Sequence, residues 1–232
     1  MKESNGVLRT KIISDDENKH VYEICREFDT EGDEIILITL FPTITNPNQC
    51  DLSGMHMLNH ASDEGLALKK IHFVFLFSSV SSAKMSTKGL KLDKDNMAYL
   101  RDIIMKLPDA KIVISFGNSM SRNAAGLESK VELFRIINEL RPNEALWQLE
   151  ADGMNEEAAH MLYAGIRYGD LSWSLSHYLV PYRYTPEGYE AYLKGKEAAR
   201  ERFIQNVLSK KKEDTGRDEK TGKGRKKSEN KE

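Results

Sequence analysis

The chain has 232 residues, and its 34 Lys and Arg residues nearly balance its 36 Asp and Glu residues, for a net charge of −2. A hydrophobic fraction of 40% is enough to bury a core, which excludes a wholly disordered protein. No apolar run approaches the roughly 18 residues of a membrane helix, and the N-terminus has no hydrophobic signal segment. Cys25 and Cys50 are the only cysteines, so we expect a cytoplasmic α/β protein without a disulfide framework or a membrane partner.

The first predicted element is a β-hairpin. Val7–Ile13 and Val21–Phe28 are rich in apolar and β-branched residues, and the polar cluster Ser14–Asn18 separates them. Two such runs joined by turn-forming residues are typical of an antiparallel pair. We expect this pair at the edge of a sheet.

Three continuous apolar runs follow the hairpin. They are Ile35–Phe41, Ile71–Phe77 and Lys111–Phe116, and a shorter run at Ala145–Leu149 predicts a fourth strand. Strands that are covered on both faces have continuous rather than alternating apolar residues. These runs therefore predict parallel strands that lie between two layers of helices.

Helical patterns alternate with these runs. The expected helices are Ser53–Lys69, Asp93–Leu107, Glu128–Leu140, Asn155–Ile166 and a longer one at Pro186–Leu208. Asp93 is the expected N-cap of the second helix. Alternating strands and helices of these lengths are typical of a three-layer α/β/α sandwich with right-handed crossovers. We predict one domain over residues 1–208, with a mainly parallel four-stranded sheet, the N-terminal β-hairpin and a long C-terminal helix.

The last segment, Ser209–Glu232, has a different composition. It holds 10 basic and 6 acidic residues and no hydrophobic residue, so it cannot bury apolar area to offset the entropy of ordering. We predict a disordered charged tail over residues 209–232. A basic tail could bind nucleic acid through counterion release, but the interspersed acids favour a tail that only adds solubility.

The loops that follow the three long strands are rich in hydroxyl and amide side chains. Residues 41–47, 78–82 and 117–123 contain Ser, Thr and Asn and no acid. In open parallel sheets, ligands bind beyond the carboxyl ends of the strands. Small donors and exposed N–H groups suit an anion or the edge of a nucleobase, whereas hard cations prefer carboxylates. We therefore expect neither a metal nor a cofactor, although the same residues could simply cap the following helices.

Four histidines are candidates for catalytic or metal-binding groups. His56 and His60 are four residues apart on an expected helix, but no further ligand stands at a recognised spacing, so a surface pair is favoured. His72 begins a buried strand and is interpreted as structural. His177 precedes a short apolar stretch late in the domain, where an imidazole could act as acid, base or oxyanion donor. A structural, hydrogen-bonded His177 is the alternative.

Seven short segments carry a resemblance to a known family. In chain order they are Tyr22–Phe28, Leu40–Thr45, Asp51–Ser53, Phe75–Phe77, Asn96, Phe116–Gly117 and His177–Val180. They stand in the order of motifs that include Tyr-x-Leu-x-Arg-x-Trp, Leu-Asn-Pro-Ser-Thr-Ala and His-Pro-Leu-Tyr. The chain thus resembles domain of unknown function 1643, found in bacteria and mobile elements, over roughly residues 20–182. The resemblance implies that Pro42, Thr43 and Asn96 belong to the functional site.

The same layout is similar, more distantly, to the uracil-DNA glycosylase fold. That fold also has a proline after its first strand and a late loop that contains a histidine. Its water-activating acid, in the motif Gly-Gln-Asp-Pro-Tyr, has no counterpart in Leu40-Phe41-Pro42-Thr43. The similarity therefore implies a fold rather than glycosylase chemistry.

We predict a module that binds a nucleotide, a nucleobase or a nucleic-acid end at the carboxyl edge of the sheet. Hydrogen bonds would come from Thr43, Asn46, Asn118 and Ser119, and Gly117 would allow close backbone approach. Such a module would suit an accessory protein of a plasmid or phage.

Two other functions stay open. One is an enzyme that flips a base out of nucleic acid, with Asp51 or His177 orienting a water molecule. The other is a protein-interaction domain without a ligand pocket, in which the long C-terminal helix is the partner surface.

Overall fold

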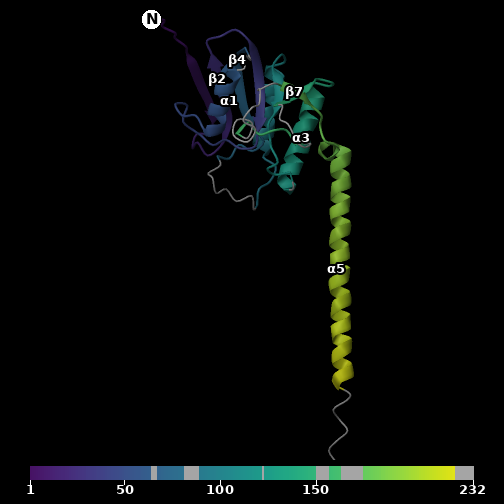
Figure 1. The fold of residues 1–232 in the computed structure, drawn as a ribbon. Coiled ribbons are helices and arrows are strands. Elements are labelled where there is room, and N and C mark those ends of the chain that lie inside the picture. The colour runs from purple at the N-terminus through teal and green to yellow at the C-terminus, as the bar shows by residue number, and fades with distance from the viewer. Residues whose placement is uncertain (64–66, 81–88, 122, 150–156, 163–174, 223–232) are drawn as a thin grey trace, which may run out of the picture. The chain divides into compact units, whose positions relative to one another are not determined.

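A computed structural model describes residues 1–63, 67–80, 89–121, 123–149, 157–162 and 175–222. The strands and helices, drawn in Figure 1, are β1 (Leu8–Ser14), β2 (Val21–Phe28), β3 (Asp33–Thr39), α1 (Leu52–Asp63), β4 (Leu68–Phe75), α2 (Lys94–Lys106), β5 (Lys111–Ile114), α3 (Ala124–Leu140), β6 (Leu146–Leu149), β7 (Leu175–Tyr178), the 3-10 turn η1 (Tyr182–Tyr184) and α5 (Pro186–Gly222). The chain divides into two compact units, residues 1–186 and residues 187–232. The sheet belongs to the first unit.

The sheet is mixed and has seven strands, in the order β1-β2-β4-β3-β5-β6-β7. Strands β4, β3, β5 and β6 are mutually parallel and form its centre. The hairpin β1–β2 joins β4 in antiparallel orientation, with β1 at the edge as expected, and β7 joins β6 in antiparallel orientation at the other edge. The prediction of a mainly parallel, four-stranded sheet is therefore wrong in extent, because antiparallel strands extend the parallel centre on both sides.

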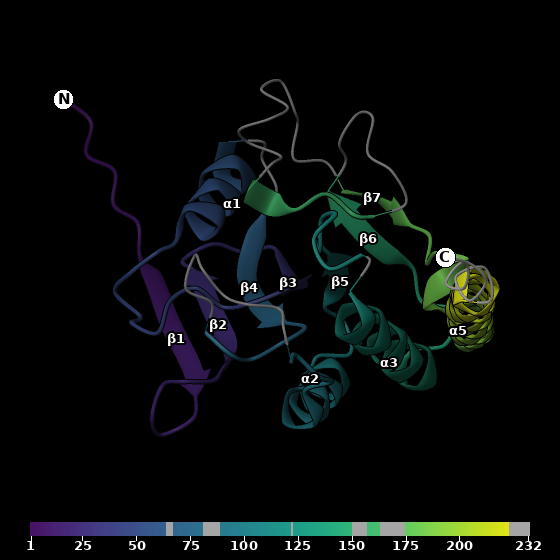
Figure 2. The same ribbon diagram turned by 90° about the horizontal axis from the view of Figure 1, so that it is seen from below.

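Helices cover both faces of the sheet. Figure 2 shows α1 on one side and α2 with α3 on the other. Alternate residues of β3 serve the two layers: Ile35 and Leu37 pack in the cluster that includes Met57 of α1, and Ile36 and Ile38 are fully buried as well. Burial on both faces explains why these strands have continuous apolar runs.

The connections that follow β3 and β5 diverge at the carboxyl ends of these strands. These two strands are neighbours. The chain leaves β3 for α1 on one face and leaves β5 for α3 on the other face. In open α/β sheets, ligands bind where adjacent connections diverge in this way.

Capping side chains determine where the helices begin. Asp93 caps α2 as expected, because its side chain accepts a hydrogen bond from the backbone N–H of Asn96 at 3.1 Å. Helix α3 begins at Ala124, four residues before the expected start, because Asn123 accepts from the N–H of Gly126 at 3.1 Å. Half of the helix expected at Asn155–Ile166 lies outside the described residues, and of residues 157–162, which are described, only 161–162 are helical.

Helix α5 has 37 residues and extends to Gly222, into the segment for which a disordered tail was expected. It has many charged residues, and its ion pairs include Lys194 with Glu190 at 2.9 Å, four residues apart. Residues 223–232 lie outside the described part of the chain. None of the helices that the structure describes has the length and apolar character needed to cross a bilayer.

Candidate functional site

A pocket lies at the carboxyl end of β3, on the face of the sheet that carries α1. Its apolar walls include Phe41, Phe73 and Phe75. Polar groups enter it from four separate segments of the chain: Arg26, Thr43, Asp51 and His160. An apolar pocket with a few convergent polar groups is the usual form of a small-molecule site.

The carboxylate of Asp51 caps the start of α1 with one oxygen and contacts Thr43 with the other. Its Oδ1 accepts a hydrogen bond from the N–H of Gly54 at 2.7 Å, and its carbonyl accepts from the N–H of Met55 at 2.9 Å. Its Oδ2 accepts from the hydroxyl of Thr43. Two predicted site residues are thus hydrogen-bonded to each other, and the helix N-terminus orients the carboxylate.

The segment with His160 packs against the end of β5, and Gly117 makes this possible. The N–H of Gly117 donates to the carbonyl of Ala158 at 2.8 Å. A Cβ on Gly117 would lie 2.8 Å from the Cβ of His160, and the φ of Gly117 is +64°. Only glycine tolerates both conditions without strain. The neighbour that approaches Gly117 closely is His160 of the same chain, whereas the sequence predicted a ligand at this position.

Ser115 holds the same segment through a pair of hydrogen bonds. Its hydroxyl donates to the carbonyl of Ala159 at 2.9 Å and accepts from the N–H of Met161 at 2.9 Å. Because Ser115 and Ala159 are completely buried, these bonds fix the backbone on both sides of His160.

The surroundings of His160 favour the neutral form of its imidazole. Burial lowers its pKa below the ordinary value of 6.5, and the charge of Asp51 opposes this shift. Its Nδ1 accepts a hydrogen bond from the N–H of Leu162 at 3.2 Å. A neutral ring that accepts at Nδ1 carries its proton on Nε2, which is then a donor.

Arg26 is a buried cation whose described partners are uncharged. Its guanidinium donates to the hydroxyl of Thr10 and to the carbonyls of Pro47, at 3.4 Å, and Gln49. Only 5% of its surface is exposed. In the described part of the chain no carboxylate forms an ion pair with Arg26, whereas buried charges in proteins are normally paired.

The other loop residues predicted for the site have different environments. Pro42 is buried next to Phe41, whose ring stacks on Phe77 with centroids 5.1 Å apart. Asn46 is exposed, and its Oδ1 accepts from the N–H of Asn48 at 2.9 Å in a local turn. Asn118 and Ser119 are exposed, and neither lines the pocket.

Asn96 is completely buried in the layer of α2, on the opposite face of the sheet. Its Nδ2 donates to the carbonyl of Phe75 at 2.6 Å, which connects the first turn of α2 to the end of β4. This contact gives Asn96 a structural role.

His177 lies in the edge strand β7. It pairs with Trp147 across the strands, and the two rings are 4.6 Å apart. Trp147 in turn pairs with Val113, the residue before the last of β5. His177 does not line the pocket that contains Asp51. The histidine that shares a pocket with Asp51 is His160, which sequence reasoning missed because it falls within an expected helix. The flanking Ala158 and Ala159 are the only local signal, since small residues permit close packing.

Comparisons with known proteins give one family. No curated protein matches the chain. The model of a family described as "Protein of unknown function (DUF1643)" matches residues 22–156, which is more than half of the chain and extends from β2 through β6. Arg26, Asp51 and Gly117 fall within the match, and His160 and His177 lie beyond it. On this match, the chain belongs to the DUF1643 family of proteins of unknown function.

Proposed function

We propose that this protein binds a nucleobase or nucleotide in the pocket at the carboxyl end of β3. The single observation that carries the proposal is the convergence of Arg26, Asp51 and His160 in one aromatic-walled pocket. This pocket lies beyond the carboxyl end of β3, and ligands of open α/β sheets bind beyond the carboxyl ends of the strands.

The walls and the polar groups suit different parts of such a ligand. Phe41, Phe73 and Phe75 provide apolar and aromatic surface for a planar ring. The carboxylate of Asp51 still has acceptor capacity beyond its two described hydrogen bonds, so it can accept from a ring N–H or an amino group. The Nε2–H of His160 can donate to a ring carbonyl.

Arg26 favours a ligand that also has an anionic group. An anionic group would supply the charged partner that the guanidinium lacks among the described residues. Asp51 would repel a bare anion, so a ligand with both a hydrogen-bonding ring and a phosphate fits better than phosphate alone. A nucleic-acid end has the same two parts, and a nucleic-acid partner is therefore included in the proposal.

The proposal can be tested by thermal shift with nucleobases, nucleosides, nucleotides and short single-stranded oligonucleotides. A ligand that binds the native state raises the melting temperature. We expect a shift for wild type that His160→Ala largely removes and His177→Ala leaves unchanged. The absence of a shift with every compound would reject the pocket as a nucleotide site. A shift that depends on His177 and not on His160 would reject this choice of residues.

A nucleic-acid-processing enzyme is the second candidate, favoured by Asp51 and a neutral His160 in the same pocket. A carboxylate and a neutral imidazole are groups that can accept a proton from water during hydrolysis. Incubation with labelled oligonucleotides tests this function. Release of a base or strand cleavage that Asp51→Asn abolishes would favour the enzyme, whereas a thermal shift without any product would favour the binding module.

A further inference from the structure

A second cluster of polar side chains is buried on the face of the sheet that carries α2. It consists of Glu23, Cys25 and His72, and one ligand atom of each residue lies within 4.8 Å of the other two. All three are at least 92% buried. This cluster is separate from the pocket of Asp51 and His160.

Strand register brings these residues together. Cys25 of β2 lies directly opposite His72 of β4, and Glu23 is two residues before Cys25. Because side chains alternate along a strand, Glu23 and Cys25 project to the same face. Glu34 of β3 reaches the same histidine, since His72 pairs with Ile36 two residues further along β3.

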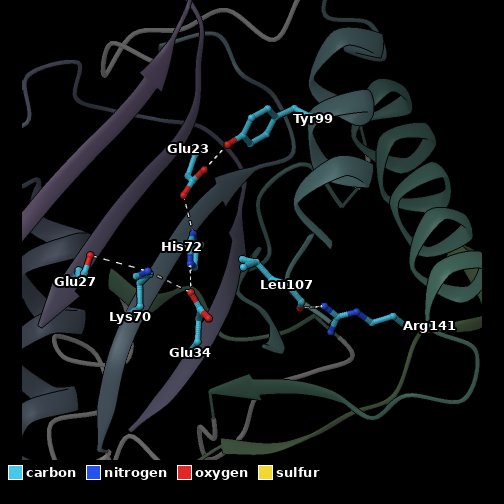
Figure 3. Close-up of polar contacts among 8 residues, drawn as sticks. All are labelled: Glu23, Glu27, Glu34, Lys70, His72, Tyr99, Leu107 and Arg141. Atoms are coloured by element: carbon cyan, nitrogen blue, oxygen red, sulfur yellow. Dashed lines mark hydrogen bonds and ion pairs between the residues drawn. The ribbon is translucent and has the colours of Figure 1, made fainter. Parts of the chain in front are cut away.

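The hydrogen bonds around His72 have the pattern of an outer coordination shell. Figure 3 shows the ring between two carboxylates, with Nδ1 at 2.7 Å from Oε1 of Glu23 and Nε2 at 2.8 Å from Oε1 of Glu34. The hydroxyl of Tyr99 donates to Oε2 of Glu23. Metal-binding histidines almost always donate their second ring N–H to a carboxylate or carbonyl, and ligating carboxylates are themselves hydrogen-bonded. Glu34 and Tyr99 occupy these two positions.

We propose that Glu23, Cys25 and His72 form a Zn²⁺ site, with Oε1, Sγ and Nδ1 as ligand atoms and with Glu34 and Tyr99 as the outer shell. One thiolate, one imidazole and one carboxylate are the three ligand types that zinc uses. Mg²⁺ and Ca²⁺ prefer oxygen ligands alone and do not suit this set. The ion would replace the proton on Nδ1 of His72 and the proton of the Cys25 thiol, as metal binding requires.

A cavity next to the cluster gives the ion access and room for water. Glu23 and His72 line it together with Tyr99, Lys11, Asp102 and Lys106. Three protein ligands and one water form a four-coordinate site, the usual number for zinc. The carboxylate of Asp102 at this cavity would attract an approaching cation, and Lys11 and Lys106 would oppose it.

The test is a metal titration of the full chain after treatment with a chelator. We expect one Zn²⁺ per chain by calorimetry, and we expect Co²⁺ to give the charge-transfer absorption of a cobalt–thiolate bond. Cys25→Ser should remove this absorption and weaken binding by at least about tenfold, whereas Cys50→Ser, the matched control with the exposed cysteine, should keep both. Glu34→Gln should retain the absorption and weaken binding by about 10–100-fold, the range for an outer-shell partner.

Two results would overturn the proposal. One is the absence of stoichiometric Zn²⁺ uptake by wild type, which would leave the cluster as a buried network held by protons. The other is a cobalt spectrum that is unchanged in Cys25→Ser. If Cys25→Ser does not fold, as judged by circular dichroism, Glu34→Gln is compared with the control Cys50→Ser instead. An unaltered affinity of Glu34→Gln for Zn²⁺ would then contradict the proposed coordination.

Discussion

Gly117 and His160 illustrate how one backbone conformation positions a candidate site residue. The left-handed φ of Gly117 and its contact with His160 allow the 158–161 segment to pack on the end of β5. Sequence reasoning expected a ligand at this glycine. The structure instead uses the missing side chain for a contact within the protein, and this contact places an imidazole in the pocket that holds Asp51.

Gly117→Ala tests this contact. The added Cβ would meet the Cβ of His160 at 2.8 Å in addition to the strain of a positive φ, so we expect a destabilisation of about 1–3 kcal/mol. Gly89→Ala is the matched control, because Gly89 also has a positive φ, of +85°, but nothing within 4 Å of the added carbon. Chemical unfolding measures both variants. Equal losses of stability in the two variants would show that the contact with His160 adds no destabilisation to the strain of the positive φ.

The pKa of His160 gives the pH dependence of stability a definite sign. Burial lowers this pKa below 6.5 in the folded protein, so the unfolded chain binds a proton first as the pH falls. The contribution of His160 is complete above the unfolded pKa and is lost as the pH falls toward the folded pKa. We expect His160→Gln to lose less stability than wild type between about pH 7 and about pH 5, measured by urea unfolding. His177→Gln is the control, and an identical slope in wild type and His160→Gln would contradict the expectation.

At the scale of elements, the caps of α2 and α3 differ in how many contacts they make. Asn123 satisfies one N–H of α3, that of Gly126. Asp93 does the same for Asn96 and also accepts from the N–H and the hydroxyl of Ser78, at 3.0 and 2.6 Å, beyond the end of β4. Asp93 thus connects helix and strand as well as capping the helix, which a sequence signal for a cap does not reveal.

Alanine variants of the two caps should therefore differ in stability. Asn123→Ala should cost about 1 kcal/mol, the usual value for a lost N-cap. Asp93→Ala should cost more, because two donors of Ser78, which is 1% exposed, lose their acceptor as well. Thermal unfolding monitored by circular dichroism gives the ranking, and a larger loss for Asn123→Ala would contradict it.

On the scale of the whole molecule, a buried ionic cluster connects parts of the chain that are far apart in sequence. Lys130 of α3 is completely buried, and its Nζ lies 3.0 Å from Oε2 of Glu157 and 3.1 Å from the hydroxyl of Tyr184. Arg183 contacts Oε1 of Glu157 at 2.5 Å. Burial lowers the pKa of Lys130, and Glu157 opposes the shift. The cluster holds η1 and the segment that leads to His160 against α3.

Lys130→Met should destabilise the first unit by about 3–5 kcal/mol, because it removes one partner of a buried pair. The additional change Glu157→Gln should recover part of this loss, since the acid is then no longer a buried charge with one partner missing. Urea unfolding of the single and double variants measures the effect. This account would be contradicted if the double variant lost more stability than the two single variants lose together.

The sequence by itself determined the elements of the parallel centre, the hairpin and the cap at Asp93. These features are local, because a continuous apolar run or a capping residue acts over a few neighbours. The sequence also indicated Thr43, because polar residues that follow a buried strand lie at its carboxyl end. It indicated Asp51 as a residue that could orient a water molecule, and Gly117 as a position of close backbone approach.

Only the tertiary structure decided which side chains meet. The four-residue strand β7 is too short to have a pattern of its own, and it forms because β6 offers an open edge. The pairing of Cys25 with His72 follows from strand register, and the meeting of Asp51 with His160 follows from the packing of a distant segment on β5. Register and long-range packing depend on contacts between residues far apart in the chain, and local patterns do not specify them.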